Sequence, residues 1–429
     1  MNLKLKLLVL VSVITLAKNA SADIDFYDYK IKDSYVSTIF GTSQSNKATI
    51  QSAPFRQGEL RLKKADTVPE NFWFNEELKY AKAIQEGHAP LAFLIAGTGG
   101  NHISPKVKLM ANILYDLGYS VVTLPSPSHS NFIVSSSSNS SVGGIEQDIK
   151  DLKNVILKIS QDIIKEDNAF ITNYVVGGYS LGAAHSAFLS YYADQDKNYP
   201  IKFSKVLMVN PPYDLLESAI KIDKMFIENV GTEEEDLKRF YEGVYSTVAE
   251  TYNELGGIEV GPEFLLEIYK RRNIKEADVK AAIGTAFRFS SADMVYSIDV
   301  MKKMGIIVPK DKIIGQFDVL RPYVRKSLVY GFEKYAEKML TKIYNKPLKQ
   351  LSEETSMRAI ENYLKSSEKI YLMHNQNDFI LKEGDIDYFK RVFGNRAHIY
   401  PYGGHCGNMD HKENVALIQK LFKLEKEEK

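Results

Sequence analysis

One serine of the chain lies between two glycines at the end of an apolar run, in the stretch VVGGYSLGAAHS. Ser180 has Gly178 two residues before it and Gly182 two residues after it. This G-x-S-x-G pattern follows a predicted strand and precedes a predicted helix, which is the setting of a nucleophile elbow. The glycines are expected because a side chain on either flank of so tight a turn would clash. The alternative is an ordinary glycine-rich strand–helix loop that contains an inert serine.

A serine hydroxyl is a weak nucleophile at neutral pH, so the hypothesis requires a histidine base and an orienting carboxylate. His405 lies in a predicted loop directly after a strand, in the sequence Gly403-Gly404-His405, where flexible backbone can aim an imidazole. The other histidines lie before or close after the elbow, inside predicted strands, or at the start of the last helix: His88, His102, His129, His185, His374, His398 and His411. We therefore expect His405 to be the base.

The orienting carboxylate should follow a strand that comes before the histidine in the chain. Asp378 ends the predicted strand EKIYLMHNQND, so its side chain leaves the sheet before the chain turns into a helix. It would hold the imidazole and stabilise its charged form. The alternative role for Asp378 is a cap of the following helix. Asp385 and Asp387 are weaker candidates because they lie on that helix itself.

Predicted strands and helices alternate from Pro90 to about residue 209, which favours a mainly parallel sheet covered on both faces. The alternation stops at Tyr213, and the next part of the chain is helical in pattern and rich in tyrosine. We predict an α/β core formed by residues 23–212 and 366–429, interrupted by a helical cap or lid at 213–365. Within the core, residues 23–89 form a lead-in of short strands and turns, with a short helix that ends at Gly87.

The order Ser180, Asp378, His405 on alternating strands resembles the α/β-hydrolase fold, whose triad runs serine, acid, histidine along the chain. The resemblance covers the chain from about Pro90 to its C-terminus, apart from the helical block. The long spacing between Ser180 and Asp378 departs from a minimal member, but the family commonly carries its lid at this point. The resemblance implies a serine esterase or lipase-like enzyme with helices on both faces of the sheet and a large helical cap.

The resemblance also implies an oxyanion hole made of two backbone N–H groups. One belongs to Leu181, directly after the nucleophile. The other comes from the turn AGTGG that follows an early predicted strand, where Thr98 is the expected donor and Gly97 and Gly99 are less favoured. These glycines are not a phosphate-binding loop, because the sequence has neither G-x-G-x-x-G nor a following Lys-Ser/Thr.

The N-terminus has the features of a secretory signal peptide over residues 1–22. Lys4 and Lys6 precede a short apolar stretch, and Ala20-Ser21-Ala22 is a suitable cleavage site. The apolar stretch is shorter than the roughly 20 residues of a transmembrane helix, although an uncleaved anchor is the alternative. We expect the mature protein to be exported, either periplasmic or secreted, and to have no transmembrane segment.

The composition of the chain limits which partners, disulfides and metal or cofactor sites can be expected. The chain has 429 residues and a formal net charge of +1, with both signs of charge spread along it, so no nucleic-acid partner is expected. Cys406 is the only cysteine, which excludes an internal disulfide. It is rejected as a nucleophile because the elbow already holds a serine. No cluster has the spacing of a metal site, and the chemistry requires no cofactor.

These features together predict an exported serine hydrolase that cleaves an ester, as a carboxylesterase or lipase-like enzyme acting on a small-molecule or lipid-like substrate. The large helical lid favours a bulky or apolar acyl group. The same triad serves acyltransferases, thioesterases and amidases, so these remain alternatives. A further alternative is a binding protein that has kept the fold and lost the chemistry.

Overall fold

The computed structural model describes residues 27–254 and 262–424. The predicted signal peptide therefore lies outside the described residues. One eight-stranded sheet has the strand order β1-β2-β4-β3-β5-β6-β7-β8. Strand β2 is antiparallel to both of its neighbours, β1 and β4, whereas β3 to β8 form a parallel sheet with β4. The strands are β1 Arg56–Leu60, β2 Leu78–Ala83, β3 His88–Ile95, β4 Ser120–Leu124, β5 Phe170–Tyr179, β6 Phe203–Val209, β7 Ile370–Asn375 and β8 Ala397–Tyr400.

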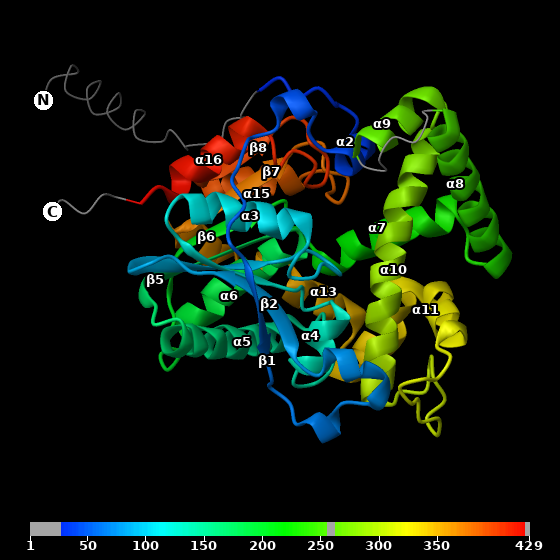
Figure 1. Cartoon of the computed structure of the whole chain (residues 1–429), viewed down its shortest axis with the longest axis horizontal. Coiled ribbons are helices and arrows are strands. Elements are labelled where there is room, and N and C mark those ends of the chain that lie inside the picture. Colours follow the sequence, from blue (N-terminus) through cyan, green and yellow to red (C-terminus); the bar gives the residue numbers. More distant parts are fainter. Residues whose placement is uncertain (1–26, 255–261, 425–429) are drawn as a thin grey trace, which may run out of the picture.

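Helices join the strands and cover the sheet (Figure 1). Those outside the β6–β7 connection are α2 Ser34–Phe40, α3 Pro105–Asp116, α4 Ser130–Ser135, α5 Ile145–Glu166, α6 Leu181–Gln195, α15 Asp385–Phe393 and α16 Lys412–Phe422. Those between β6 and β7 are α7 Leu215–Asn229, α8 Glu234–Glu254, α9 Pro262–Arg271, α10 Glu276–Lys302, α11 Arg321–Lys334, α12 Thr341–Tyr344, α13 Leu348–Thr355 and α14 Glu361–Ser366. In the described part of this connection the chain forms no strand.

Each strand in the middle of the sheet is buried on both faces. On β3, Leu91, Phe93 and Ile95 join the core beneath α5 and α6. Ala92 and Leu94 alternate with them and join the core beneath α3 and α16. Figure 1 shows these helix pairs on opposite sides of the sheet. This arrangement confirms the expected α/β fold with a mainly parallel sheet and helices on both faces.

A buried ion pair ties together three helices of the β6–β7 connection. Arg288 of α10 lies 2.9 Å from the carboxylate of Asp223 on α7 and donates to the carbonyl of Leu328 on α11. Asp223 also accepts the N–H groups of Phe332 and Glu333. Removal of one partner would leave the other charge buried and unpaired, at a cost of several kcal/mol. The pair therefore fixes how α7, α10 and α11 pack.

The N-terminal lead-in differs from its prediction. The chain forms helix α2 where strands were expected, and a strand, β2, where a helix ending at Gly87 was expected. The sequence LKYAKA of β2 consists largely of good helix formers, but the segment pairs with β1 on one side and β4 on the other. Tertiary pairing overrides local propensity in such a case. The lead-in thus supplies two strands at one edge of the sheet.

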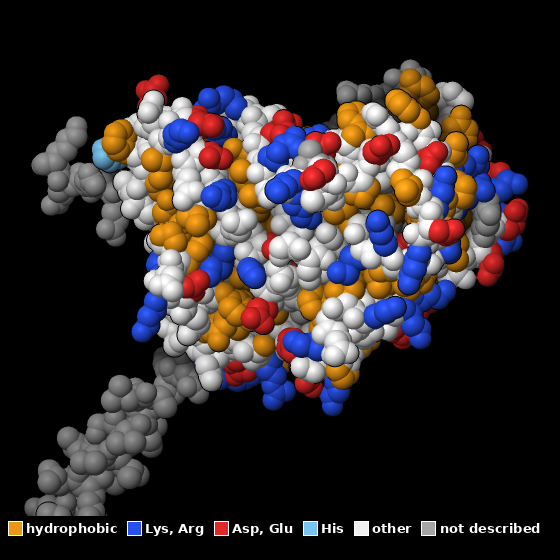
Figure 2. Space-filling view, turned by 90° about the horizontal axis from the view of Figure 1, so that it is seen from below, with side chains coloured by type: hydrophobic (Ala, Val, Ile, Leu, Met, Phe, Trp, Pro, Cys, Tyr) orange, Lys and Arg blue, Asp and Glu red, His pale blue; other side chains and the backbone are white. Residues whose placement is uncertain are grey.

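No helix in the two described ranges is long and apolar enough to cross a membrane. On the face shown in Figure 2, lysine and arginine side chains are interspersed with acidic ones. Apolar side chains lie between them on the same face. The mixed signs agree with the near-zero net charge of the sequence.

One buried histidine makes the stability of the fold depend on pH. His102 is only 9% exposed, and its Nε2 lies 2.7 Å from Oε1 of Gln57. Burial, helped by the charges of His129 and Lys79, lowers the pKa of His102 from 6.5 to about 4. Unfolded chains therefore bind more protons than folded ones between these values, so the free energy of unfolding falls as the pH drops.

We predict that His102 alone removes up to about 3 kcal/mol from the unfolding free energy between pH 6.5 and pH 4. His102→Gln should flatten this part of the curve because glutamine does not titrate. Urea unfolding at several pH values measures the difference. Parallel curves for the variant and the wild type would contradict the prediction.

Candidate active site

Ser180 occupies a sharp turn between a strand and a helix. Strand β5 ends at Tyr179 and helix α6 begins at Leu181, which leaves Ser180 alone in the turn. Its backbone has φ 55° and ψ −125°, a conformation that a residue with a side chain rarely adopts. The Ser180 N–H donates to the carbonyl of Val209 at the end of β6. Strain of this kind at a single, partly buried serine is typical of functional sites.

The two flanking glycines make this turn possible. A Cβ atom on Gly178 would lie 2.4 Å from the carbonyl carbon of Gly182. A Cβ atom on Gly182 would lie 2.1 Å from the carbonyl oxygen of Ile95 at the end of β3. Helix α6 can therefore begin directly over the ends of β3 and β5 only because both positions lack a side chain.

The structure brings the three residues Ser180, Asp378 and His405 together in one hydrogen-bonded line. His405 Nε2 lies 2.9 Å from Ser180 Oγ, and His405 Nδ1 lies 2.9 Å from Asp378 Oδ2. An ionised carboxylate only accepts, so Nδ1 must carry the proton. Nε2 is then free to accept the hydrogen of the serine hydroxyl. This is the tautomer that a general base requires.

Asp378 is held ionised by its surroundings. It follows β7 and is 4% exposed. Its carboxylate accepts from the side-chain amide of Asn210 and from the N–H of Ile380, in addition to His405. Burial alone would raise the pKa of this carboxyl, but the charge and the hydrogen bond of His405 bring it below its usual value. Asp378 can therefore stabilise a positive imidazole.

The weaker candidates do not join this line of hydrogen bonds. Asp385 and Asp387 are in the first turn of α15, where Asp385 accepts the N–H of Lys382. His374 is fully buried, and its Nε2 lies 2.9 Å from the carbonyl oxygen of Pro211. The Nδ1 of His374 lies 3.8 Å from Oδ2 of Asp378, so this histidine lies next to the site. None of these groups forms the line to Ser180.

The turn after β3 lies beside Ser180, and its backbone N–H groups differ in whether they have a hydrogen-bond acceptor. The N–H of Gly99 donates to Oγ of Ser128, and the N–H of Gly100 donates to the carbonyl of Gly97. In the described part of the chain the amide of Thr98 has no such acceptor. Leu181 is the first residue of helix α6, and the first N–H groups of a helix have no acceptor within the helix. Thr98 and Leu181 are thus the two residues whose amides remain available for an oxyanion.

Both of these residues line a small cavity under the helices of the β6–β7 connection. The cavity has a volume of about 30 Å³, enough for a few water molecules. Its other walls are mainly apolar and come from the segment before α5 and from α7, α10 and the α11 region: Val142, Leu215, Leu216, Ala219, Met294, Phe332, Tyr335 and Leu340. Helix α10 also reaches the turn itself, where Ser290 occupies the space that a Cβ on Gly99 would need.

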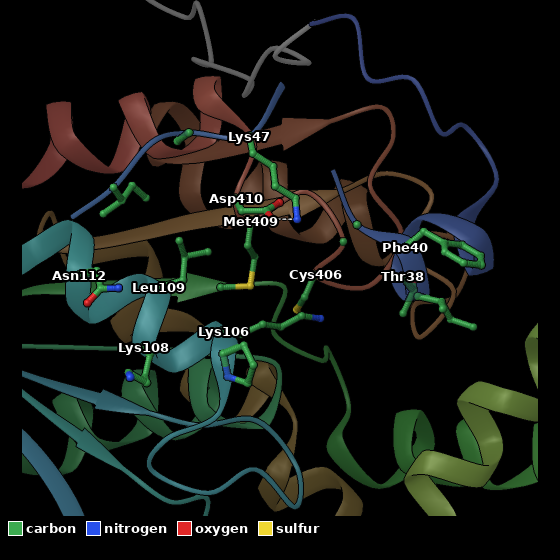
Figure 3. A pocket seen from close by; sticks show the side chains of 16 residues that line it. Thr38, Phe40, Lys47, Lys106, Lys108, Leu109, Asn112, Cys406, Met409 and Asp410 are labelled. Carbon is green, nitrogen blue, oxygen red and sulfur yellow. Dashed lines mark ion pairs between the residues drawn. The ribbon is translucent and has the colours of Figure 1, made fainter. Parts of the chain in front are cut away.

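Helix α2 holds the loop that carries His405, a contact that the sequence did not indicate. The N–H of His405 donates to Oγ1 of Thr38 at 2.8 Å. Gly404 has a φ of +54°, and a Cβ there would lie 2.1 Å from the carbonyl oxygen of Ser34. Thr38 and Cys406 both line an adjoining pocket (Figure 3). No residue pattern flags a threonine that accepts a hydrogen bond from a distant main chain.

Cys406 is 2% exposed although it follows His405 directly. Burial raises the pKa of its thiol to about 12, so the sulfur stays protonated at neutral pH. This agrees with its rejection as a nucleophile. In residues 27–254 and 262–424, no three His, Cys, Asp or Glu side chains are grouped so that they could hold a metal ion.

Neither protein-family models nor curated proteins match the sequence. Several solved structures resemble the chain weakly. An esterase from Pyrococcus furiosus aligns with 93% of this chain and 98% of its own, at 11% identity and a TM-score of 0.41. The thioesterase domain from the curacin biosynthetic pathway aligns with 85% and 99%, at 12% identity and a TM-score of 0.38. A proline iminopeptidase from Mycobacterium smegmatis aligns with 80% and 94%, at 13% identity and a TM-score of 0.38.

These similarities are too weak to carry an argument about activity. The fold follows from the chain's own architecture: an antiparallel β2 paired with the first of six parallel strands, and a serine on a strained strand-to-helix turn. The protein is therefore of the α/β-hydrolase fold, as the order of Ser180, Asp378 and His405 in the sequence suggested.

The elbow gives a direct test of packing. We predict that Gly182→Ala lowers the free energy of unfolding by about 1–3 kcal/mol, because the new methyl group would overlap the Ile95 carbonyl. Gly243→Ala is the matched control, since Gly243 lies on an exposed part of α8 with no atom near its missing Cβ. The control should be neutral or stabilise by up to about 1 kcal/mol. Urea unfolding compares the two, and equal effects would contradict the steric argument.

Proposed function

We propose that the protein is an exported serine hydrolase that cleaves carboxylic esters through an acyl-enzyme. The observation that carries the proposal is the line of hydrogen bonds from Ser180 through His405 to Asp378. It lies beside Thr98 and Leu181, two residues that line a common cavity. Nucleophile, base, orienting acid and oxyanion donors are then present within one small region.

In the first half of the reaction, Ser180 Oγ attacks the ester carbonyl carbon while His405 Nε2 takes its proton. The carbonyl oxygen becomes an oxyanion, and the amides of Leu181 and Thr98 donate to it. Asp378 stabilises the imidazolium through Nδ1. The tetrahedral intermediate then collapses, His405 returns the proton to the departing alkoxide, and the alcohol leaves with the acyl group on Ser180.

In the second half, water replaces the alcohol. His405 Nε2 takes a proton from the water, whose oxygen attacks the acyl carbon, and the same amides hold the second oxyanion. Collapse of this intermediate breaks the bond to Ser180 Oγ. His405 returns the proton to the serine, and a carboxylic acid is released. The cycle needs no group other than the protein and water.

The cavity beside Thr98 and Leu181 supports an apolar acyl group as the substrate. Its walls include Leu216, Met294 and Leu340, which offer no hydrogen bond to a polar chain. A cavity of about 30 Å³ cannot hold an acyl chain, so the helices above it must move apart when the substrate binds. We therefore assign α10 and α11, together with the rest of residues 213–365, to a cap over the active site.

The first test is the reactivity of the serine. Mature protein treated with a fluorophosphonate probe should carry one adduct, located by mass spectrometry on the peptide that contains Ser180. Ser180→Ala should lose the adduct and should hydrolyse p-nitrophenyl esters at least about a thousandfold more slowly. Circular dichroism checks that the variant is folded. An adduct on another residue, or hydrolysis unchanged by the substitution, would contradict the assignment.

Labelling and turnover measurements also distinguish the alternative functions from one another. A folded wild type that takes up no probe and cleaves no ester would favour a binding protein that has kept the fold. Formation of a new ester when an alcohol is added would indicate an acyltransferase. Faster turnover of thioester or amide substrates than of oxygen esters would change the assigned substrate class. The roles of Ser180, His405 and Asp378 would stay the same.

The cap assignment predicts a change in acyl-chain preference. Leu340→Ala should enlarge the cavity and shift the preferred p-nitrophenyl ester toward acyl chains that are longer by a few carbons. Leu351→Ala is the control, because Leu351 is buried in the same hydrophobic core and does not line the cavity. Both changes should cost about 2–5 kcal/mol of stability. A shift that is equal in the two variants would contradict the assignment.

A further inference from the structure

The first helix and the last strand–helix loop of the described chain meet at the candidate base. Thr38 Oγ1 accepts the N–H of His405 at 2.8 Å, across a separation of 367 residues. The hydroxyl of Thr38 is itself directed by its own hydrogen bond to the carbonyl of Ser34, at 2.7 Å. Its lone pairs are thereby turned toward the loop. The histidine backbone is thus fixed by a side chain outside the line of Ser180, His405 and Asp378.

The contact between α2 and the loop is close over its whole length. A Cβ on Gly407 would lie 2.0 Å from the carbonyl oxygen of Ser37, which leaves no room between the two segments. Tyr29 donates its hydroxyl hydrogen toward the carbonyls of Gly41 and Gly407, at 2.8 and 3.2 Å. The loop and α2 therefore form one packed unit.

Asn377 joins the same unit from the strand side. Its side-chain oxygen accepts the N–H of Gly404, and its side-chain N–H donates to the carbonyl of Lys32. Asn377 directly precedes Asp378 in the chain. The segment before α2 is thus linked to the positions next to both the base and the acid.

Helix α2 also lies against the proposed cap. The ring of Tyr35 stacks on Phe379 at 5.1 Å, and the ammonium group of Lys280 from α10 lies 4.7 Å from the centre of the Tyr35 ring. Phe40 contacts Tyr269 of α9, with ring centres 5.3 Å apart. Helix α2 therefore contacts α9 and α10 of the proposed cap as well as the loop of His405.

We propose that Thr38 is a positioning residue for His405, acting through the main-chain N–H of the histidine. The proposal rests on the function assigned to His405 above. The imidazole has to span 2.9 Å to Ser180 on one side and 2.9 Å to Asp378 on the other. Rotation of the ring cannot correct a displaced backbone at both distances. An acceptor on the His405 N–H fixes the backbone from which the ring projects.

The test compares three variants. Thr38→Val keeps the shape of the side chain and removes the acceptor, whereas Thr38→Ser keeps the hydroxyl. Thr355→Val is the control for the general cost of such a change. Thr355 is buried in α13 and donates to the carbonyl four residues earlier, as Thr38 does. It has no contact with the His405 loop.

We expect Thr38→Val to lower kcat for a p-nitrophenyl ester about tenfold with little change in KM, because a displaced base slows the chemical step. Thr38→Ser should stay within about twofold of the wild type, because it keeps the hydroxyl that accepts the N–H of His405. Hydrogen exchange read by mass spectrometry should be faster in the peptide that contains residues 403–407 of Thr38→Val, and unchanged in that peptide of the other two variants.

The hydrogen-exchange measurement does not depend on turnover. The proposed function and the positioning role of Thr38 can therefore be contradicted separately. A wild type without esterase activity and without probe labelling would overturn the proposed function. Equal exchange in the 403–407 peptide of all variants would overturn the positioning role whether or not the enzyme is active. An equal loss of kcat in Thr38→Val and Thr38→Ser would also overturn it, because the hydroxyl would then not be the group that matters.

Discussion

The arrangement of the whole site depends on the close approach between the start of α6 and the end of β3. Gly178 and Gly182 permit it because neither has a side chain to collide with the Ile95 carbonyl or with the other glycine. Ser180 is then forced into a backbone conformation that lifts its hydroxyl above the sheet. The parallel sheet places the two other residues, since the carboxyl ends of its strands bring Asp378 and His405 to the same edge as Ser180.

Two kinds of packing hold that edge. Beneath it, the two cores on either side of the sheet fix the strands and hence the origins of the loops. Above it, the buried ion pair between Arg288 and Asp223 joins helices α10 and α7. Helix α2 touches both the cap and the loop of His405. The N-terminal lead-in, whose purpose could not be inferred from the sequence, therefore packs beside the loop of His405.

The sequence predicted those parts of the structure that depend on order along the chain. Ser180 was found because the glycine spacing coincides with a strand-to-helix change, and Asp378 and His405 because each follows a later strand. Strand β2 was missed because its lysines and alanines favour a helix locally, and only pairing with β1 and β4 decides otherwise. The contact of Thr38 was missed because a threonine beside a distant backbone amide leaves no pattern in the sequence.

The meeting of α2 with the loop of His405 also has a consequence for biosynthesis. A chain is made from its N-terminus, so α2 emerges early and the loop that it packs against emerges almost at the end. Until residue 407 has been added and has folded back, Ser180 has no hydrogen bond to His405, and the loop of His405 has no contact with α2. Every shorter nascent chain therefore lacks the line of hydrogen bonds from Ser180 through His405 to Asp378.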